Sequence, residues 1–367
     1  MTGITRYDRL VVAPRIAPRR LTAGLGVLAA LAAFAFAPQR AAAETAPIEV
    51  ADGAVVMLQA PGRSEISVRS WDRSSVSVQT ESDETVDIAH RTAVFGPGRL
   101  PLGFAVPPIM WNIRRDTPAA ASGIIPPEDF PFSNFRAGVH DVVHINAQPG
   151  AHLTVMVPAS TGVLVVRGGV AQTAIDGFHG GNLIVAQGGG RVTIDNTATT
   201  AFVQLGGGAL SVTDSAFERM RYRSIGASAF FERCRARQIE TSTVTGTVVF
   251  DGGTFDPGLA RFESQFGSIA LGMAGDAQVL ARSQQGHVYT QFDRRVAVEQ
   301  RSESEASAVV GSGGPLVNAL SGHGNVFLYD GTLRSRPNGR LPQQWRDVHR
   351  ALAGHRVRQP AAQHPRR

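Results

Sequence analysis

Three aspartates that close successive apolar segments are the residues of this sequence best placed to do chemistry. Asp195, Asp214 and Asp251 each follow a short apolar run, and stacking of these runs would bring Asp195 and Asp214 close together. Clustered carboxylates on stacked strands could serve as acid and base toward a polysaccharide, or hold Ca²⁺. The competing interpretation is structural, because Asp at a strand exit accepts hydrogen bonds from turn amides. Turn-like residues after each aspartate, with no Arg or His at a matching position, favour the structural interpretation.

A second candidate is the histidine pair His140 and His144, which are separated by one helical turn or four strand positions. The segment around them alternates like a strand, where such a separation spans about 13 Å. Zinc–nitrogen bonds are about 2 Å long, so we predict that the pair does not share a metal ion. The sequence contains no Gly-x-Ser-x-Gly elbow, phosphate-binding loop, dinucleotide fingerprint or calcium-binding nonapeptide. We therefore predict no catalytic residue, no metal site and no cofactor.

Residues 1–43 are typical of an export signal. Arginines precede an apolar run from Leu21 to Ala37, and Ala41-Ala42-Ala43 stands before Glu44. We predict cleavage between Ala43 and Glu44, because the Ala-rich run is marginal for an uncleaved anchor. Whether export uses the general or the twin-arginine route stays open. The single cysteine, Cys234, excludes an internal disulfide and a lipidated N-terminus, so we expect a periplasmic, secreted or cell-surface protein.

Charge is distributed unevenly along the 367 residues. Residues 1–43 carry a net charge of +5 and residues 332–367 one of +8, which leaves −7 of the total +6 for residues 44–331. An acidic body does not support a nucleic-acid partner. The expected partner is a cell-surface glycan or an envelope protein; no integral membrane span is expected after cleavage, and the oligomeric state stays open.

The body of the chain reads as strands with one interruption. In residues 44–95, alternating apolar residues flank the turn Asp72-Arg73-Ser74 as in a half-buried hairpin. Residues 96–138 contain eight prolines and form a predicted irregular insertion. Its aromatic residues either fold back on the body or face a partner, and the candidate partner-binding residues are Trp111, Phe130, Phe132 and Phe135.

Residues 139–331 repeat a glycine followed by an alternating apolar pair. The glycines recur at nearly even spacing, at Gly190, Gly208, Gly226, Gly246, Gly267 and Gly286. Each repeat is too short to bury its own apolar face, so neighbouring repeats must stack. We predict an all-β fold, a β-solenoid with coils of about twenty residues and glycines at corners that need a positive φ. In the basic segment 332–367, a short helix over 341–357 with Trp345, Val348 and Leu352 is predicted to cover the open end.

These motifs resemble the adhesin-like β-solenoid domains of exported bacterial proteins. The resemblance is carried by Ile66-Ser-Val-Arg-Ser-Trp71-Asp72 with Val76-Ser-Val78, and by the unit Ser/Thr-x-x-Gly-x-apolar at Thr243–Val248, Ser264–Ile269 and Ser283–Val288. It covers roughly residues 48–92 and 150–330; the Pro-rich insertion departs from the family pattern. The resemblance implies export, a solenoid and surface interaction, and it supplies no catalytic residues.

The sequence thus leads to one principal hypothesis and two rivals. The principal one is an exported non-enzymatic β-solenoid, an adhesin or envelope surface-interaction protein of unassigned ligand. The rivals are a polysaccharide lyase or hydrolase of the parallel β-helix type, and a structural scaffold of an envelope complex. Because function resides in sites and not in folds, the arrangement of side chains must decide among them.

Overall fold

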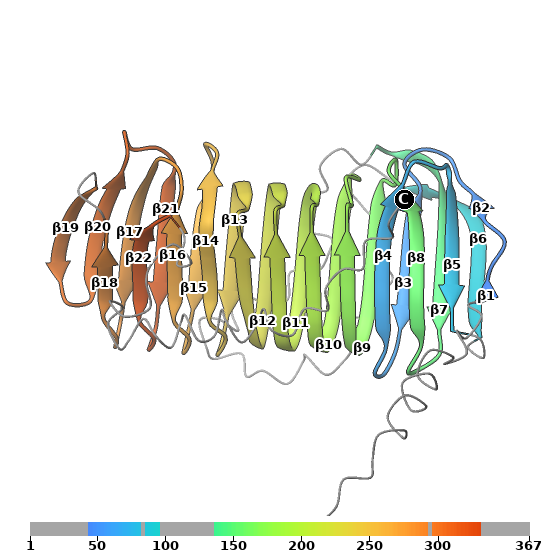
Figure 1. Cartoon of the computed structure of the whole chain (residues 1–367), viewed down its shortest axis with the longest axis horizontal. Helices are drawn as coiled ribbons and strands as arrows, with labels where there is room; N and C mark the ends of the chain where they lie inside the picture. The colour runs from blue at the N-terminus through green and yellow to red at the C-terminus, as the bar shows by residue number, and fades with distance from the viewer. Residues whose placement is uncertain (1–42, 82–84, 96–135, 293–295, 332–367) are drawn as a thin grey trace, which may run out of the picture. The chain divides into compact units, whose positions relative to one another are not determined.

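The computed structural model describes residues 43–81, 85–95, 136–292 and 296–331, which all lie in one compact unit spanning Ala42–Arg367 (Figure 1). Within these ranges the chain forms strands and turns and no helix, which confirms the all-β prediction. None of these residues belongs to a helix long and apolar enough to cross a membrane. The helix predicted over 341–357 lies outside the described residues.

The strands fall into three groups along the chain. The first group is β1 (Ala43–Glu44), β2 (Ile48–Glu49), β3 (Val55–Ala60), β4 (Glu65–Trp71), β5 (Ser75–Thr80) and β6 (Val86–Phe95). The second is β7 (Gly138–Ala147), β8 (His152–Pro158), β9 (Val163–Asp176), β10 (Asn182–Asp195), β11 (Ala198–Thr213), β12 (Ala216–Glu232), β13 (Arg235–Thr243), β14 (Val248–Phe255), β15 (Ala260–Ser264) and β16 (Ile269–Met273). The third is β17 (Ala277–Ser283), β18 (Val288–Gln291), β19 (Ala297–Ser302), β20 (Glu305–Val310), β21 (Leu316–Ser321) and β22 (Val326–Asp330).

From β9 to β16, successive segments pair in parallel at the interval that the glycines predict. Asn182 of β10 lies opposite Val163 of β9 on one side and Thr200 of β11 on the other. Between β13 and β15, Ile239 lies opposite Ala260, which is again one repeat further along the chain. Each segment therefore supplies the hydrogen-bond partners of the next, and the side chains keep the same facing from layer to layer.

Sequence order breaks down at both ends, contrary to the expectation that neighbouring repeats stack throughout. Strand β3 lies between β7 and β9, since Val55 pairs with both Val142 and Val163. Strand β21 likewise lies between β15 and β17, and Val317 pairs with both Ala260 and Val279. An end segment of the described chain thus sits inside each end of the row of strands (Figure 1).

The hairpin predicted around Asp72-Arg73-Ser74 is also wrong, although both of its strands exist. Strand β4 runs parallel to β8 and strand β5 runs antiparallel to it, so β8 lies between the two. Alternating apolar residues identify a strand but not its partner. Antiparallel strands also border the row elsewhere, with β6 along β7 and β20 along β17.

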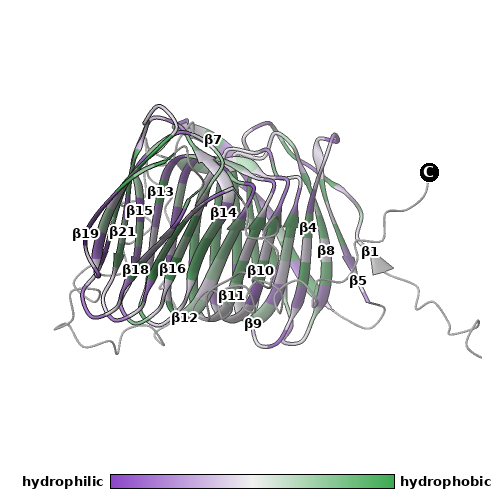
Figure 2. Cartoon of the chain, turned by 60° about the vertical axis from the view of Figure 1, so that its left-hand side comes forward, coloured by the Kyte–Doolittle hydropathy of each residue, from purple (hydrophilic) through white to green (hydrophobic). Residues whose placement is uncertain are grey.

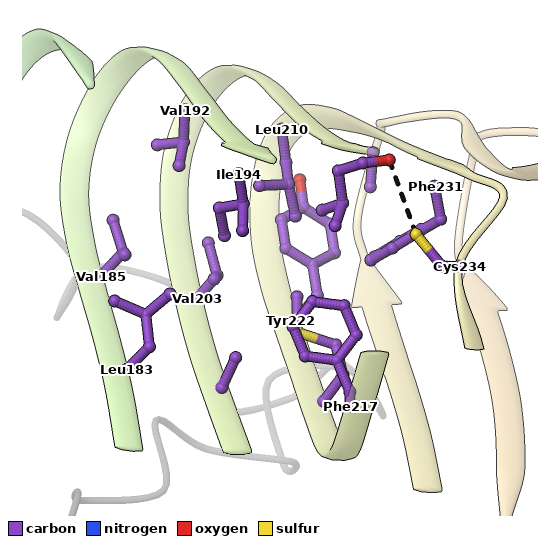
Figure 3. Close-up of a cluster of buried hydrophobic side chains, with 14 of the residues drawn as sticks. Leu183, Val185, Val192, Ile194, Val203, Leu210, Phe217, Tyr222, Phe231 and Cys234 are labelled. Atoms are coloured by element: carbon purple, nitrogen blue, oxygen red, sulfur yellow. Dashed lines mark hydrogen bonds between the residues drawn. The ribbon is translucent and has the colours of Figure 1, made fainter. Parts of the chain in front are cut away.

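Inward-facing residues stack into apolar columns that form the main core. Ile194, Val212 and Phe231 lie opposite one another on β10, β11 and β12 and are buried. Figure 3 shows Ile194 and Phe231 among the side chains gathered on one side of the translucent strands. Full burial of each such side chain stabilises the fold by about 1.5–3 kcal/mol. Alternate residues on the same strands face outward, which gives the banded hydropathy of the strands in Figure 2.

Glycine at the repeat corners has two different causes. Gly190 and Gly208 have φ values of 98° and 97°, as the prediction requires. At Gly246, Gly267 and Gly286, φ is not positive, and the cause is close stacking instead. A Cβ on Gly267, for example, would lie 1.9 Å from the carbonyl oxygen of Gly246 in the neighbouring layer.

The sixth predicted corner glycine, Gly226, is displaced by one position. It lies opposite Gly207, whereas Ala227 lies opposite Gly208 and occupies the corner position of its layer. The column continues through Gly324, which the repeat pattern does not include: a Cβ there would lie 2.2 Å from the carbonyl oxygen of Gly267. This position follows from the insertion of β21 between β15 and β17.

The Ser/Thr-x-x-Gly units connect the corners of neighbouring layers by hydrogen bonds. Within each unit, the hydroxyl oxygen accepts a hydrogen bond from the N–H of the unit's glycine, at 2.8 Å for Ser264 and Gly267. The same hydroxyl donates to the corner carbonyl of the adjacent layer, at 3.0 Å for Ser264 and Gly246. The other units that make both bonds begin at Thr243, Ser283 and Ser321. These hydroxyls satisfy backbone groups that the corner would otherwise bury unpaired.

We expect Gly208→Ala to destabilise the protein by roughly 2–4 kcal/mol, because it combines a strained φ with a backbone clash. The added Cβ would lie 1.8 Å from the carbonyl oxygen of Gly190. The adjacent Gly207→Ala is the control, since its Cβ meets nothing within 4 Å. Urea unfolding followed by circular dichroism measures both; equal midpoints would contradict the corner argument.

A second variant, Ser264→Ala, removes only the hydroxyl. It leaves the N–H of Gly267 and the carbonyl of Gly246 without this partner, which costs about 1–3 kcal/mol. Ser242→Ala serves as the control because Ser242 faces outward on neighbouring β13, and we expect a change within about 0.5 kcal/mol. The same unfolding measurement applies, and a Ser264→Ala protein as stable as the control would show that the hydroxyl is dispensable.

Candidate functional site

The predicted partner-binding aromatics, Trp111, Phe130, Phe132 and Phe135, lie outside the described residues. Of the predicted cleavage site, Ala43 and Glu44 form β1, which pairs with β5; cleavage itself stays a prediction. The segments that flank the insertion are described. Phe95 at the end of β6 is buried in a second apolar cluster with outward-facing residues of β3, β9, β10 and β11.

The aspartate pair expected from stacking does not form. Asp195 lies opposite Thr213, not Asp214, and accepts a hydrogen bond from the Thr213 hydroxyl at 2.7 Å. Asp214 itself turns the chain, with a φ of 48°. The expectation that no arginine matches these positions is also wrong, because Arg233 donates to Asp214 at 2.7 Å and also contacts Glu232. The hydrogen bonds to Asp214 and the nearby carboxylate charges raise the pKa of Arg233.

Asp251 is buried inside β14, which continues through the turn predicted after it. One carboxylate oxygen accepts a hydrogen bond from the buried Tyr329 hydroxyl at 3.0 Å. Each of the three aspartates therefore forms a hydrogen bond that supports the fold. In the described ranges, no group of three His, Cys, Asp or Glu side chains is arranged to hold a metal ion.

The histidine segment is a strand, as predicted. His140 and His144 both lie on β7. The His140 ring bridges two backbone carbonyls, with Nδ1 2.9 Å from the Gly53 oxygen and Nε2 2.8 Å from the Arg136 oxygen. His140 thereby holds the start of β7 against the turn before β3.

A set of charged and polar side chains lies on the outward side of β12, β13, β15, β21 and β17, here called the polar outer face. Arg219, Arg221 and Arg223 alternate with core residues along β12. Arg219 donates to Gln238 of β13 at 2.7 Å, and Arg221 pairs with Glu240 at 3.1 Å. Partial burial lowers the pKa of Arg223, and the charge of Arg221 lowers it further.

A groove of about 410 Å³ is hollowed into this face where β15, β21, β17 and β20 meet. Its charged lining includes Arg261, Arg282, Arg301, Glu263 and Glu305. Two of the arginines are paired: Arg261 donates to Glu263 at 2.8 Å, and Arg301 lies 3.3 Å from Glu305. Arg282 makes no ion pair with any residue of the described ranges.

Apolar carbon also lines the groove. Leu259 and Leu280 are 43% and 42% exposed there, and the Asn318 amide lies on the strand between them. Guanidinium groups recognise carboxylate and other anionic oxygens through two parallel N–H donors, and exposed aliphatic carbon packs against a ligand's apolar faces. The groove can therefore hold a ligand that combines negative charge, hydroxyls and C–H surface.

Part of this site has a sequence signal that the repeat analysis did not use. The order Arg219-Met-Arg-Tyr-Arg223 alternates charge with apolar residues at period two, as one polar and one buried face of a strand require. The groove has no such signal. It depends on β21 entering between β15 and β17, which joins residues that are far apart in the chain.

Fold and site together define an all-β chain whose strands pair in parallel from β9 to β16, with a charged outer face. No protein-family model matches it, and no curated protein matches it. A solved structure described as a putative cell adhesion protein from Clostridium sporogenes matches at 7% identity, over 79% of this chain and 99% of that one, with a TM-score of 0.21.

Cys234, the single cysteine, is buried in the main core and has no disulfide (Figure 3). Burial raises the pKa of its thiol to about 12. A thiol of ordinary pKa, about 8.5, ionises in the unfolded chain first. The thiol therefore contributes stability that is complete below pH about 8.5 and is lost as the pH rises toward 12.

We expect native Cys234 to resist iodoacetamide at pH 9 and to react once urea unfolds the chain, because only the thiolate is nucleophilic. The unfolding free energy should also fall less steeply between pH 9 and 11 in Cys234→Ala than in the parent protein. Fast alkylation of the native protein, or identical pH slopes, would contradict the burial of this thiol.

Proposed function

We propose that the protein is an exported, non-enzymatic β-solenoid that acts as an adhesin-like or envelope surface-interaction protein. The parallel registers from β9 to β16 support the solenoid, because each layer pairs with the segment one repeat further along the chain. Export is proposed from the signal pattern of residues 1–43, with a periplasmic or cell-surface location.

The ligand class we propose is an acidic glycan bound along the polar outer face. The observation that carries this proposal is the groove, where the guanidinium of Arg282 has no ion-pair partner in the described ranges and lies beside exposed leucine carbon. Arginines and hydrogen-bonding side chains continue along β12 and β13 at the strand spacing, about 4.8 Å per layer. An extended polymer can make many individually weak contacts with such a face, and their sum gives useful avidity.

Absence of catalysis is part of the proposal. The aspartates Asp195, Asp214 and Asp251 each contact a hydroxyl or a guanidinium of the fold. This supports a structural part for the carboxylates over an acid and base pair. A glycan that was shortened on incubation with the protein would instead favour the polysaccharide-active alternative.

We expect Arg282→Ala to weaken binding of an acidic polysaccharide such as polygalacturonate by roughly fivefold, about 1 kcal/mol, through loss of one charge-assisted contact. Arg73→Ala is the matched control, since it removes the same charge from an exposed residue in the turn between β4 and β5, away from the polar outer face. Isothermal titration at two salt concentrations measures both variants. Equal affinities would remove the groove from the proposal, and equal binding of a neutral glucan would remove the acidic ligand.

A further inference from the structure

A second outward-facing stripe of the same layers is apolar and is covered. Phe230, Val249, Ala270, Phe327 and Tyr289 lie opposite one another on β12, β14, β16, β22 and β18; together they are called the lateral stripe. Their neighbours along each strand, such as Phe231 and Phe250, belong to the main core, so the stripe points the other way.

Outward residues of a strand are normally exposed to solvent, but four of these five are buried and Tyr289 is half-buried. Phe230 is 8% exposed, Phe327 2% and both Val249 and Ala270 0%. The rings of Phe327 and Tyr289 stack at a centroid distance of 5.3 Å. Among the described strands, those with extensive contacts to β14, β16 and β22 are their neighbours in the row or along the chain. These neighbours do not lie over the stripe, so the group that covers it must come from outside the described strands.

We propose that the lateral stripe is the docking site of the chain's own basic C-terminal segment, residues 332–367. The described chain ends at Gly331, directly after Tyr329 and Asp330 on the strand that carries Phe327. The segment is tethered beside the stripe, so its effective concentration there is high. This location differs from the open end of the row, which the sequence alone suggested.

The length and the apolar pattern of the C-terminal segment match the lateral stripe. Leu341, Trp345, Val348 and Leu352 recur at helical spacing and would form one apolar face. A helix of about 13 residues is roughly 20 Å long. Five strands at about 4.8 Å per step span roughly 19 Å, so such a helix, laid across the strands, matches the stripe.

Charge favours the same partner. Glu232 and Asp251, both buried, stand next to Phe230 and Val249 on the same side of their strands. The C-terminal segment has a net charge of +8, against −7 for residues 44–331. Both carboxylates already have a partner, Arg233 for Glu232 and the Tyr329 hydroxyl for Asp251. The opposite net charges of the segment and of residues 44–331 attract each other while the apolar face covers the stripe.

Cysteine accessibility in the full-length chain tests this proposal. In a Cys234→Ala background, we expect a Val249→Cys thiol to react with iodoacetamide at least about tenfold more slowly than a Ser242→Cys thiol on the polar outer face. Replacing Trp345, Val348 and Leu352 together by Asp should raise the reaction rate at position 249 about tenfold or more. A rate that does not respond to these replacements would overturn the proposal.

A disulfide trap decides the case even if the triple replacement disturbs folding. Val249→Cys paired with Val348→Cys should form an intramolecular disulfide under mild oxidation, whereas Ser242→Cys paired with Val348→Cys should not. Failure of the first pair, together with failure of pairs at 345 and 352, counts against the segment. A disulfide that forms only between two chains would identify a second copy as the occupant and overturn the proposal.

Discussion

The whole arrangement depends on how closely two backbones can approach at the corners of the layers. Where Gly267 lies over Gly246, there is no room for a side chain. The hydroxyl of Ser264 accepts a hydrogen bond from the N–H of Gly267 and donates one to the carbonyl of Gly246. Parallel strands pair only if corners stack at the same spacing as the strands. The glycine and the hydroxyl together make that spacing possible. Once the corners are in register, the apolar residues of successive strands also lie opposite one another.

Much of the fold is readable from local patterns, because period-two alternation and evenly spaced glycines are local consequences of stacking. The all-β class, the strand that holds His140 and His144, and the interval between layers all follow from them. Register and neighbour identity do not. Asp195 meets Thr213 instead of Asp214 because a shift of one position is invisible in such a pattern, and β4 pairs with β8 instead of β5 because alternation names no partner.

The candidate site was predictable only in part for the same reason. Arg219, Arg221 and Arg223 share one face of one strand, so their alignment is a property of local sequence. Arg282 and Asn318 meet in the groove only because their strands become neighbours in the fold. The inward residues maintain the stack, which leaves the outward ones free to differ between faces. One side thus carries guanidinium and carboxylate groups, and another carries phenylalanine and valine.

The interleaved ends impose an order of folding events on a chain that is synthesised from its N-terminus. Central layers join near neighbours in sequence and can assemble as they emerge. Strand β17 cannot gain its final partner until β21 has arrived, and β3 must wait for β7. Closing these long loops is slow relative to local pairing. Folding is therefore complete only after both inserted strands, β3 and β21, have paired with their two neighbours.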